Sequence, residues 1–266
     1  MALLSFRNVW VEYGDKIVLE RVSLDIRQGE FVSIIGPSGA GKSTFLRLAL
    51  GQEAPSKGEI LLGDRPLQPE PGPDRGVVFQ RYSVFPHLTV LGNVVFGMEC
   101  GQAPVLGRLF GRQRRQALDE AAEMLASVGL GESLHVYPAQ LSGGMQQRLA
   151  IAQALIKRPR VLLLDEPFGA LDPGIRLDMH ALVTDIWRSH GLTILMVTHD
   201  LKEAFALGTR VLTFDKRRHD PQAPGRYGAT AVYDVPLDRK TLAEPVAIGC
   251  ASAEPERAEC VTVHAG

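Results

Sequence analysis

Residues 36–44 have the types and spacing of a phosphate-binding loop. They follow the apolar run 31–35, which predicts a buried strand that leads through a glycine turn into a helix. The glycines let several backbone N–H groups point at one anion, and the helix N-terminus adds partial positive charge. Lys42 can then reach the β- and γ-phosphates of a nucleotide, and the Ser43 hydroxyl is placed to ligate Mg²⁺. The loop consists of Gly36, Pro37, Ser38, Gly39, Ala40, Gly41, Lys42, Ser43 and Thr44.

A second segment suited to chemistry is the apolar run 161–164, which ends in Asp165 and Glu166. A continuous apolar run is typical of a fully buried parallel strand, and open α/β sheets bind ligands at the carboxyl ends of their strands. There Asp165 would hold Mg²⁺, directly or through water, and Glu166 would orient and deprotonate an attacking water. Taken alone, the pair could also be two solvated acids that end a strand.

Residues 141–147 read Leu-Ser-Gly-Gly-Met-Gln-Gln, and Ser142, Gly143 and Gly144 open a helix with an apolar face. A serine and two glycines at a helix N-terminus can bind an anion, although simple capping by Ser142 explains the same residues. The P-loop already surrounds one side of a triphosphate. We therefore expect the second helix end to close over a nucleotide that is held by another copy of the chain.

These segments together resemble the ATP-binding subunits of ABC transporters, over about residues 3–215. The resemblance implies that residues 36–44 are the Walker A loop, that Asp165 and Glu166 are the Walker B pair, and that residues 141–145 are the signature loop. It also implies a D-loop at residues 170–172, which includes Asp172. The ligands implied are ATP and Mg²⁺, with Ser43, Gln80 and Asp165 as metal ligands.

Three single residues gain a role from the same resemblance. Gln80 would be the Q-loop glutamine, which contacts Mg²⁺ and links the site to a transmembrane partner, but it could also simply end a strand. His199 would contact the γ-phosphate as the switch histidine beside the catalytic Glu166. Asp200 and Glu203 also have the spacing of a capping box at this point. Tyr13 would stack on adenine, or it could be an ordinary strand aromatic.

One residue departs from the family pattern, because Met145 stands where the signature loop usually has glutamine. The serine and both glycines remain, so we expect activity to survive. Methionine at this position resembles the nitrate, sulfonate and taurine importer branch. Gln146 or Gln147 could supply the missing amide, although helix geometry turns them elsewhere.

Composition sets limits on the class of protein. The 266 residues are 45% apolar, and the formal net charge of −1 gives no reason to expect a nucleic-acid partner held by bulk charge. The three cysteines are far apart and have neither metal spacing nor a disulfide pattern. No run has the length of a transmembrane helix, so a transport pore would have to lie in another chain.

The fold expected is α/β: a P-loop NTPase core of the RecA-like kind, an N-terminal antiparallel β subdomain and a helical signature subdomain. We predict an ATPase domain over residues 1–235, with the helical subdomain at about 82–155, and a mobile tail over 236–266. Strand 211–214 is expected to be the last of the sheet, with loops beyond it. Phe85, Leu88 and Val90 are predicted to line a docking groove, with a core role as the alternative.

The sequence therefore predicts an ATP-hydrolysing subunit that energises import of a small solute. The partners expected are transmembrane permease subunits, a second copy of the chain in an ATP-sandwich dimer, and, indirectly, a solute-binding protein. The location expected is peripheral, on the cytoplasmic face of the inner membrane. The alternatives are an exporter-type ATPase and a non-transport ABC ATPase. For the solute, the nitrate, sulfonate and taurine group comes first, followed by urea or guanidine, which whole-chain similarity suggests.

Overall fold

The computed structural model describes residues 2–80, 83–102, 109–223 and 225–237. The predicted tail, residues 236–266, lies outside this part of the chain except for its first two residues. Among the described residues, no helix combines the length and the apolar character that crossing a bilayer requires.

The centre of the molecule is a six-stranded sheet in the order β10-β9-β3-β8-β7-β6. Five neighbouring strands run parallel, and β10 pairs antiparallel with β9 at one edge. The parallel strands are almost entirely buried, as their continuous apolar runs predict. The strands are β3 (Phe31–Ile35), β6 (Arg75–Val78), β7 (Val161–Asp165), β8 (Thr193–Val197), β9 (Arg210–Asp215) and β10 (Thr230–Pro236).

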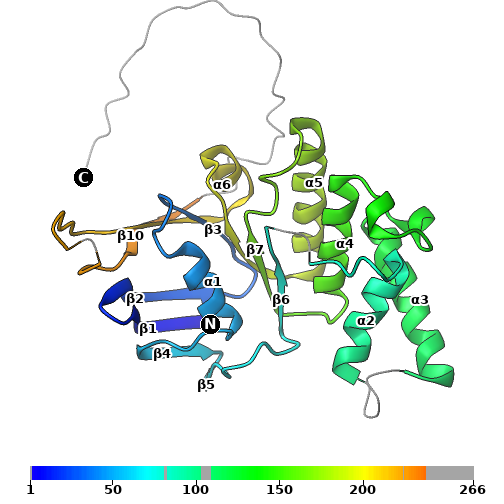
Figure 1. Cartoon of the computed structure of the whole chain (residues 1–266), viewed down its shortest axis with the longest axis horizontal. Helices are drawn as coiled ribbons and strands as arrows, with labels where there is room; N and C mark the ends of the chain where they lie inside the picture. The colour runs from blue at the N-terminus through cyan, green and yellow to red at the C-terminus, as the bar shows by residue number, and fades with distance from the viewer. Residues whose placement is uncertain (1, 81–82, 103–108, 224, 238–266) are drawn as a thin grey trace, which may run out of the picture.

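A four-stranded antiparallel sheet, in the order β2-β1-β4-β5, lies to one side of this core (Figure 1). Helix α1 (Lys42–Leu50) packs with it in one hydrophobic cluster, in which the Phe45 ring lies 4.5 Å from Phe6 and 4.9 Å from Phe214. The three rings belong to the antiparallel sheet, to α1 and to β9, so they fix the helix after the P-loop between both sheets. The strands are β1 (Ala2–Tyr13), β2 (Lys16–Arg27), β4 (Lys57–Leu62) and β5 (Arg65–Pro66).

Helices cover the other side of the core and form its second hydrophobic cluster. Val90 is fully buried in this cluster, so its predicted place in a docking groove is wrong and its alternative core role is correct. Its position at the first residue of α2 turns the side chain inward. The helices are α2 (Val90–Gln102), α3 (Gly111–Ser127), α4 (Gly143–Leu155), α5 (Pro173–His190) and α6 (Leu201–Leu207), with 3-10 turns at Gly131–Ser133 and Pro138–Gln140.

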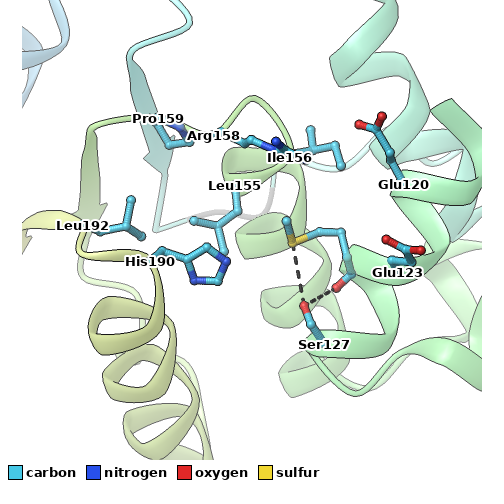
Figure 2. A pocket seen from close by; sticks show the side chains of 10 residues that line it. Glu120, Glu123, Ser127, Leu155, Ile156, Arg158, Pro159, His190 and Leu192 are labelled. Carbon is cyan, nitrogen blue, oxygen red and sulfur yellow. Dashed lines mark hydrogen bonds between the residues drawn. The ribbon is translucent and has the colours of Figure 1, made fainter. Parts of the chain in front are cut away.

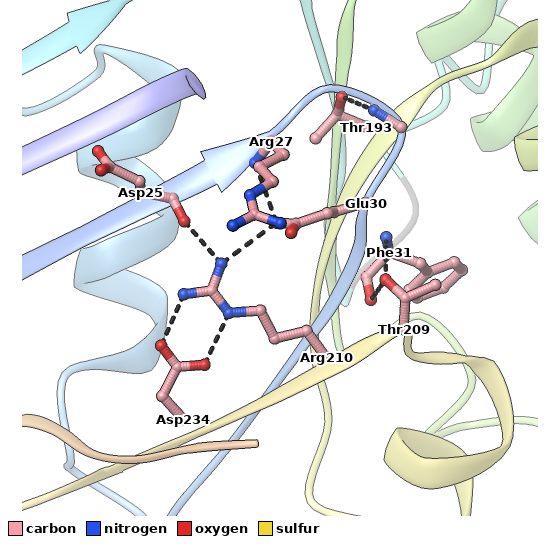
Figure 3. A network of polar contacts seen from close by, with 9 residues as sticks. Asp25, Arg27, Glu30, Phe31, Thr193, Thr209, Arg210 and Asp234 are labelled. Atoms are coloured by element: carbon pink, nitrogen blue, oxygen red, sulfur yellow. Dashed lines mark hydrogen bonds and ion pairs between the residues drawn. The ribbon is translucent and has the colours of Figure 1, made fainter. Parts of the chain in front are cut away.

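The prediction that residues 211–214 form the last strand is wrong, because β10 follows it. The chain first runs along β2, where Ala229 N–H donates to Val18 O at 2.9 Å, and then returns to pair with β9. Arg210 holds this return in place (Figure 3): its guanidinium donates to both carboxylate oxygens of Asp234, at 2.7 and 2.6 Å. It also donates to the Asp25 carbonyl at 2.6 Å and to Glu30 at 3.2 Å.

Replacing Asp234 with asparagine should loosen this attachment of β10. The change removes the charge of a bidentate ion pair whose arginine is mostly buried. Because Asp234 itself is half exposed, we expect a loss of about 1 kcal/mol in the free energy of unfolding, which corresponds to roughly 2–4 °C in the thermal midpoint. The measurement is thermal unfolding followed by circular dichroism. Glu59→Gln, at the exposed Arg7–Glu59 pair, is the control, and an equal shift in both variants would contradict the attachment.

Candidate functional site

The predicted P-loop lines a cavity of about 420 Å³ at the carboxyl ends of the parallel strands. The P-loop connects the end of β3 to the start of α1. Side chains from β1, β2, the residue after β7 and the segment after β8 line the rest of the cavity. The structure thus brings residues that are far apart in the sequence to one place. The lining consists of Tyr13, Lys16, Val18, Gly36, Ser38, Gly39, Gly41, Lys42, Ser43, Thr44, Glu166 and His199.

Two glycines of the loop are required by its geometry. Gly36 has φ +151°, and a Cβ atom there would lie 2.2 Å from the carbonyl oxygen of Phe214 on the neighbouring strand β9. Gly41 precedes α1 with φ +75°, and no side chain caps the helix. The first N–H groups of a helix have no intrahelical partners, so this end of α1 can bind an anion.

The Lys42 ammonium lies over the loop and donates to the carbonyl oxygens of Gly36 and Pro37, at 2.8 and 2.9 Å. Its side chain is almost wholly buried. A buried ammonium bound only by neutral carbonyls is a strong attractor for an anion, because carbonyl dipoles compensate its charge less well than a phosphate would. The cavity therefore combines a helix N-terminus with a buried cation.

Two acidic side chains approach the loop from the end of β7. The Ser43 hydroxyl lies 3.4 Å from Asp165 Oδ1, while Glu166 Oε2 lies 3.2 Å from Gln80 Nε2 and 3.4 Å from His199 Nδ1. Glu166 has φ +46°, in the left-handed region that is unusual for a residue with a side chain. The strained backbone aims the carboxylate at the mouth of the cavity, between a residue that follows β6 and one that follows β8.

Burial raises the pKa of the Asp165 carboxyl; the Ser43 hydroxyl opposes this shift, and the charge of Glu166 adds to it. A bound cation would favour the ionised form of such a carboxyl. The adjacent Asp165 carboxylate and Ser43 hydroxyl offer hard oxygen ligands of the kind that Mg²⁺ prefers, whereas Gln80 turns its Nε2 toward Glu166. Among the described residues, no group of three or more His, Cys, Asp or Glu side chains could hold a metal. Asp165 and Ser43 could therefore hold a Mg²⁺ ion only if phosphates and water supplied its remaining ligands.

Tyr13 lies half exposed at the rim of the cavity, and its hydroxyl donates to Glu53. Burial and the Glu53 hydrogen bond together raise the pKa of the Tyr13 phenol. Glu53 also pairs with Arg47, which donates to the Thr44 hydroxyl of the P-loop. Sequence reasoning did not find Glu53, because no local motif contains it, but it fixes the ring relative to α1.

The predicted signature residues do not line this cavity. Ser142 and Gly143 are exposed at the start of α4, and Ser142 accepts a hydrogen bond from Met145 N–H at 3.3 Å. Asp172, at the N-terminal end of α5, is also exposed. Gln146 does not replace the missing amide, since its Nε2 donates to the carbonyls of Pro138 and Leu141. The described chain therefore gathers Tyr13, the P-loop, Glu166 and His199 around the cavity and leaves the signature residues and Asp172 outside it.

A separate cavity of about 520 Å³ lies between α3, the end of α4 and the end of α5 (Figure 2). Its charged side chains, Glu120, Glu123 and Arg158, have mixed signs around an apolar floor that includes Leu155. It contains no part of the P-loop and none of the acids after β7. Although it is larger, its chemistry gives no reason to place a nucleotide there, so the P-loop cavity is the candidate site.

Comparison with known proteins shows which family the chain resembles. The family model described as ABC transporter matches residues 19–169. The chain is 44% identical to an ATP-binding protein of Brucella abortus over 89% of its own length and 85% of that protein. It is 43% identical to an aliphatic sulfonates import ATP-binding protein of Pectobacterium atrosepticum, over 89% and 80%. A dimeric ATP-binding cassette solved with ADP and phosphate has a TM-score of 0.68 at 30% identity, over 88% and 99%.

We propose that the Tyr13 ring is the platform on which the base of the nucleotide stacks. Tyr13→Ala should then weaken nucleotide binding by about tenfold, since stacking of a base on an aromatic ring contributes on the order of 1–3 kcal/mol. Tyr13→Phe keeps the ring, loses only the bond to Glu53, and should bind within about twofold of the original chain. Titration with a fluorescent ATP analogue measures both. Equal losses in the two variants would mean that the hydroxyl, and not the ring, matters.

Proposed function

The chain belongs to the ABC transporter family of ATP-binding proteins and is an ATPase, and from this premise we propose that it energises import of a small solute through a separate transmembrane permease. The observation that carries the catalytic part of the proposal is the Glu166 carboxylate, which Gln80 and His199 contact from opposite sides at the P-loop cavity. A carboxylate held in this way can orient a water and accept its proton during phosphoryl transfer.

The residues of the cavity divide the work of phosphoryl transfer, which is mostly positioning and neutralisation of charge. Lys42 and the N-terminus of α1 would bind the β- and γ-phosphates, and His199 would contact the γ-phosphate. Mg²⁺, held by Ser43 and Asp165 with Gln80 nearby, would neutralise phosphate charge during the reaction. Asp165 would bind the metal ion. Glu166 would therefore be the carboxylate that accepts the proton of the attacking water.

A second copy of the chain would complete the site. Ser142, Gly143, Gly144 and Asp172 lie outside the cavity, and the first of these begins a helix that can bind an anion. In our proposal this surface closes over the γ-phosphate that the partner's P-loop holds. Two ATP molecules would then join the two protomers, and hydrolysis would remove the phosphate that connects them. Support comes from the dimeric form of the similar cassette that was solved with ADP and phosphate.

A groove of about 380 Å³ supports docking of a permease. It lies between the end of β6 and α2, next to Gln80, and its lining includes Phe79, Phe85 and Phe96. The Phe85 ring lies 4.8 Å from that of Phe96, and Phe85 and Phe79 are each 37% exposed, so two aromatic side chains of the groove are accessible to a partner. Leu88 is half buried and does not line the groove. A permease helix inserted here would contact the segment that leads to Gln80 and so to Glu166.

For the solute, we propose an aliphatic sulfonate or a related small anion. The support is the similarity to the sulfonate importer subunit of Pectobacterium atrosepticum and Met145 in the signature loop. A urea- or guanidine-like solute is the second candidate, and an exporter or a non-transport ATPase is the alternative class. The solute-binding protein would act only through the permease, and no nucleic acid is part of the proposal. The chain would lie on the cytoplasmic face of the inner membrane, peripherally, through its permease.

Glu166→Gln should abolish most turnover while ATP binding persists. The amide cannot accept the proton of the attacking water, and general-base catalysis contributes about 10²–10⁴-fold. An ATP-bound dimer should accumulate, which size-exclusion chromatography with ATP will detect. Lys42→Ala should instead lose ATP affinity, since the buried cation of the cavity is gone. Turnover near that of the original chain in Glu166→Gln would rule out its role as the base.

Phe85→Asp should uncouple the ATPase from its permease. Burying a carboxylate in the groove when the permease docks costs a few kcal/mol, which should weaken binding of the permease strongly. Basal ATPase activity should stay unchanged, whereas stimulation by the reconstituted permease and sulfonate uptake should both collapse. Phe110→Asp is the matched control, because Phe110 is 62% exposed and lies outside the groove. Equal stimulation in both variants, or stimulation by DNA or ribosomes instead, would contradict the proposal.

A further inference from the structure

A buried polar cluster lies beneath the two segments that carry His199 and Asp172. Its centre is Glu203, on α6, which is only 5% exposed. The sequence suggests that Glu203 closes a capping box with Asp200, but the structure shows another arrangement. Asp200 caps α6 by accepting from Lys202 N–H at 2.8 Å, while the Glu203 carboxylate turns inward. A buried carboxylate is costly unless other groups bind it, so its contacts matter.

The first contact is Thr198, the residue before His199. The Thr198 hydroxyl donates to Glu203 Oε2 at 2.7 Å, and its Oγ1 accepts from the N–H of Asp200 at 3.0 Å. This chain of bonds fixes the backbone on both sides of His199, although the His199 side chain itself is exposed. Thr198 is 1% exposed, so no water competes for its hydroxyl.

The remaining contacts come from α5, the helix that begins after Asp172. Arg176 lies 3.6 Å from Glu203 and 3.5 Å from Asp200, and its Nη2 donates to the Leu171 carbonyl at 3.3 Å. Leu171 immediately precedes Asp172. One guanidinium thus touches both the segment that ends at Asp172 and the segment that follows His199.

His180, one turn further along α5, lies 3.6 Å from Glu203 and packs edge-on against Phe168, with ring centroids 4.8 Å apart. Phe168 follows Glu166 by two residues. Burial by itself raises the pKa of the Glu203 carboxyl, but the contacts with His180, Thr198 and Arg176 outweigh it and lower the pKa. The carboxylate is therefore ionised, with one short hydrogen bond from Thr198 and two longer ionic contacts from α5.

We propose that Glu203 is a positioning residue of the ATPase: through Thr198 it holds the backbone that carries His199, and through Arg176 it joins this loop to the segment of Asp172. The inference rests on the proposed roles of His199 and Asp172. It adds that the two segments do not move independently. A change at Asp172, which the second protomer would contact, reaches His199 of the same chain through Arg176 and Glu203.

Steady-state ATP hydrolysis by the full chain tests the Thr198 link. Thr198→Val keeps the shape and removes the hydroxyl, and Thr198→Ser is the matched control that keeps it. Thr198→Val should lower kcat by about 10- to 100-fold, as misplacement of a reacting group by about 1 Å does, with KM for ATP within about twofold. Thr198→Ser should stay within about threefold of the original kcat, because its hydroxyl can make both bonds. Equal kcat values in the two variants would overturn the link.

Loss of stability must be separated from loss of positioning. All rates are therefore normalised to the fraction of chains that bind a fluorescent ATP analogue. Asp234→Asn serves as a stability control, since it lowers the thermal midpoint at a distance from the site and should keep its kcat. If Thr198→Val loses activity only in proportion to its folded fraction, Glu203 has a purely structural role and the proposal fails.

His199→Ala separates failure of the inference from failure of the proposed function. If Thr198 acts through His199, adding Thr198→Val to His199→Ala should lower kcat by less than about twofold further. Losses that multiply would overturn the inference and leave the role of His199 intact. Full activity in His199→Ala would overturn that role and the inference with it.

Arg176→Gln tests the second link, because glutamine cannot contact Leu171, Asp200 and Glu203 at once. Its kcat should fall by about tenfold, and its combination with Thr198→Val should again be less than multiplicative. An unchanged kcat in Arg176→Gln, or independent losses in the double variant, would show that the two segments are not joined through Glu203.

Discussion

The rest of the structure depends on one constraint, the shared edge at which the parallel strands end. Strands β3, β8, β7 and β6 are neighbours in the sheet, and their carboxyl ends lead to Lys42, His199, Glu166 and Gln80. Helices and loops separate these strands in the sequence. Parallel pairing alone therefore brings a cation, an imidazole, a carboxylate and an amide around one cavity. The antiparallel sheet and the helices bury the two faces of the sheet, which keeps those ends in register.

A P-loop at this edge can surround only one side of a triphosphate. The start of α4 has the serine and glycines of an anion-binding helix end, and Asp172 belongs to the predicted D-loop. Ser142, Gly143 and Asp172 are exposed and lie outside the P-loop cavity. Packing explains one of these glycines, because a Cβ atom at the buried Gly144 would lie 2.6 Å from Ile175 Cγ2. In our proposal it is the exposed Ser142 and Gly143 that meet a phosphate from outside the chain. In our proposal hydrolysis depends on association, because neither protomer alone would neutralise all of the phosphate charge.

Sequence reasoning succeeded where chemistry is local and failed where it is made by distant contacts. The fold class could be predicted because the glycine loop and buried apolar strands are encoded in short segments. Strand β10 was missed, since its pairing depends on Arg210 and Asp234, which are 24 residues apart. Val90 was predicted to line an exposed docking groove, but its side chain is buried in the core. Glu203 has capping-box spacing, and only the position of α5 shows that its carboxylate turns inward.

Glu166 lies where two of these segments meet, because its carboxylate contacts both Gln80 and His199. Its backbone is strained, and its carboxylate is shared between Gln80 and His199, so a shift of either neighbour changes what the carboxylate can contact. Gln80 follows the strand that borders the Phe85 groove, and His199 follows the buried Thr198 that Glu203 binds. The carboxylate thus lies between the side of the proposed permease groove and the side that Arg176 links to the segment of Asp172. If Glu166 is the base that we propose, it is aligned only when both loops are in position, which would connect docking and dimerisation to hydrolysis.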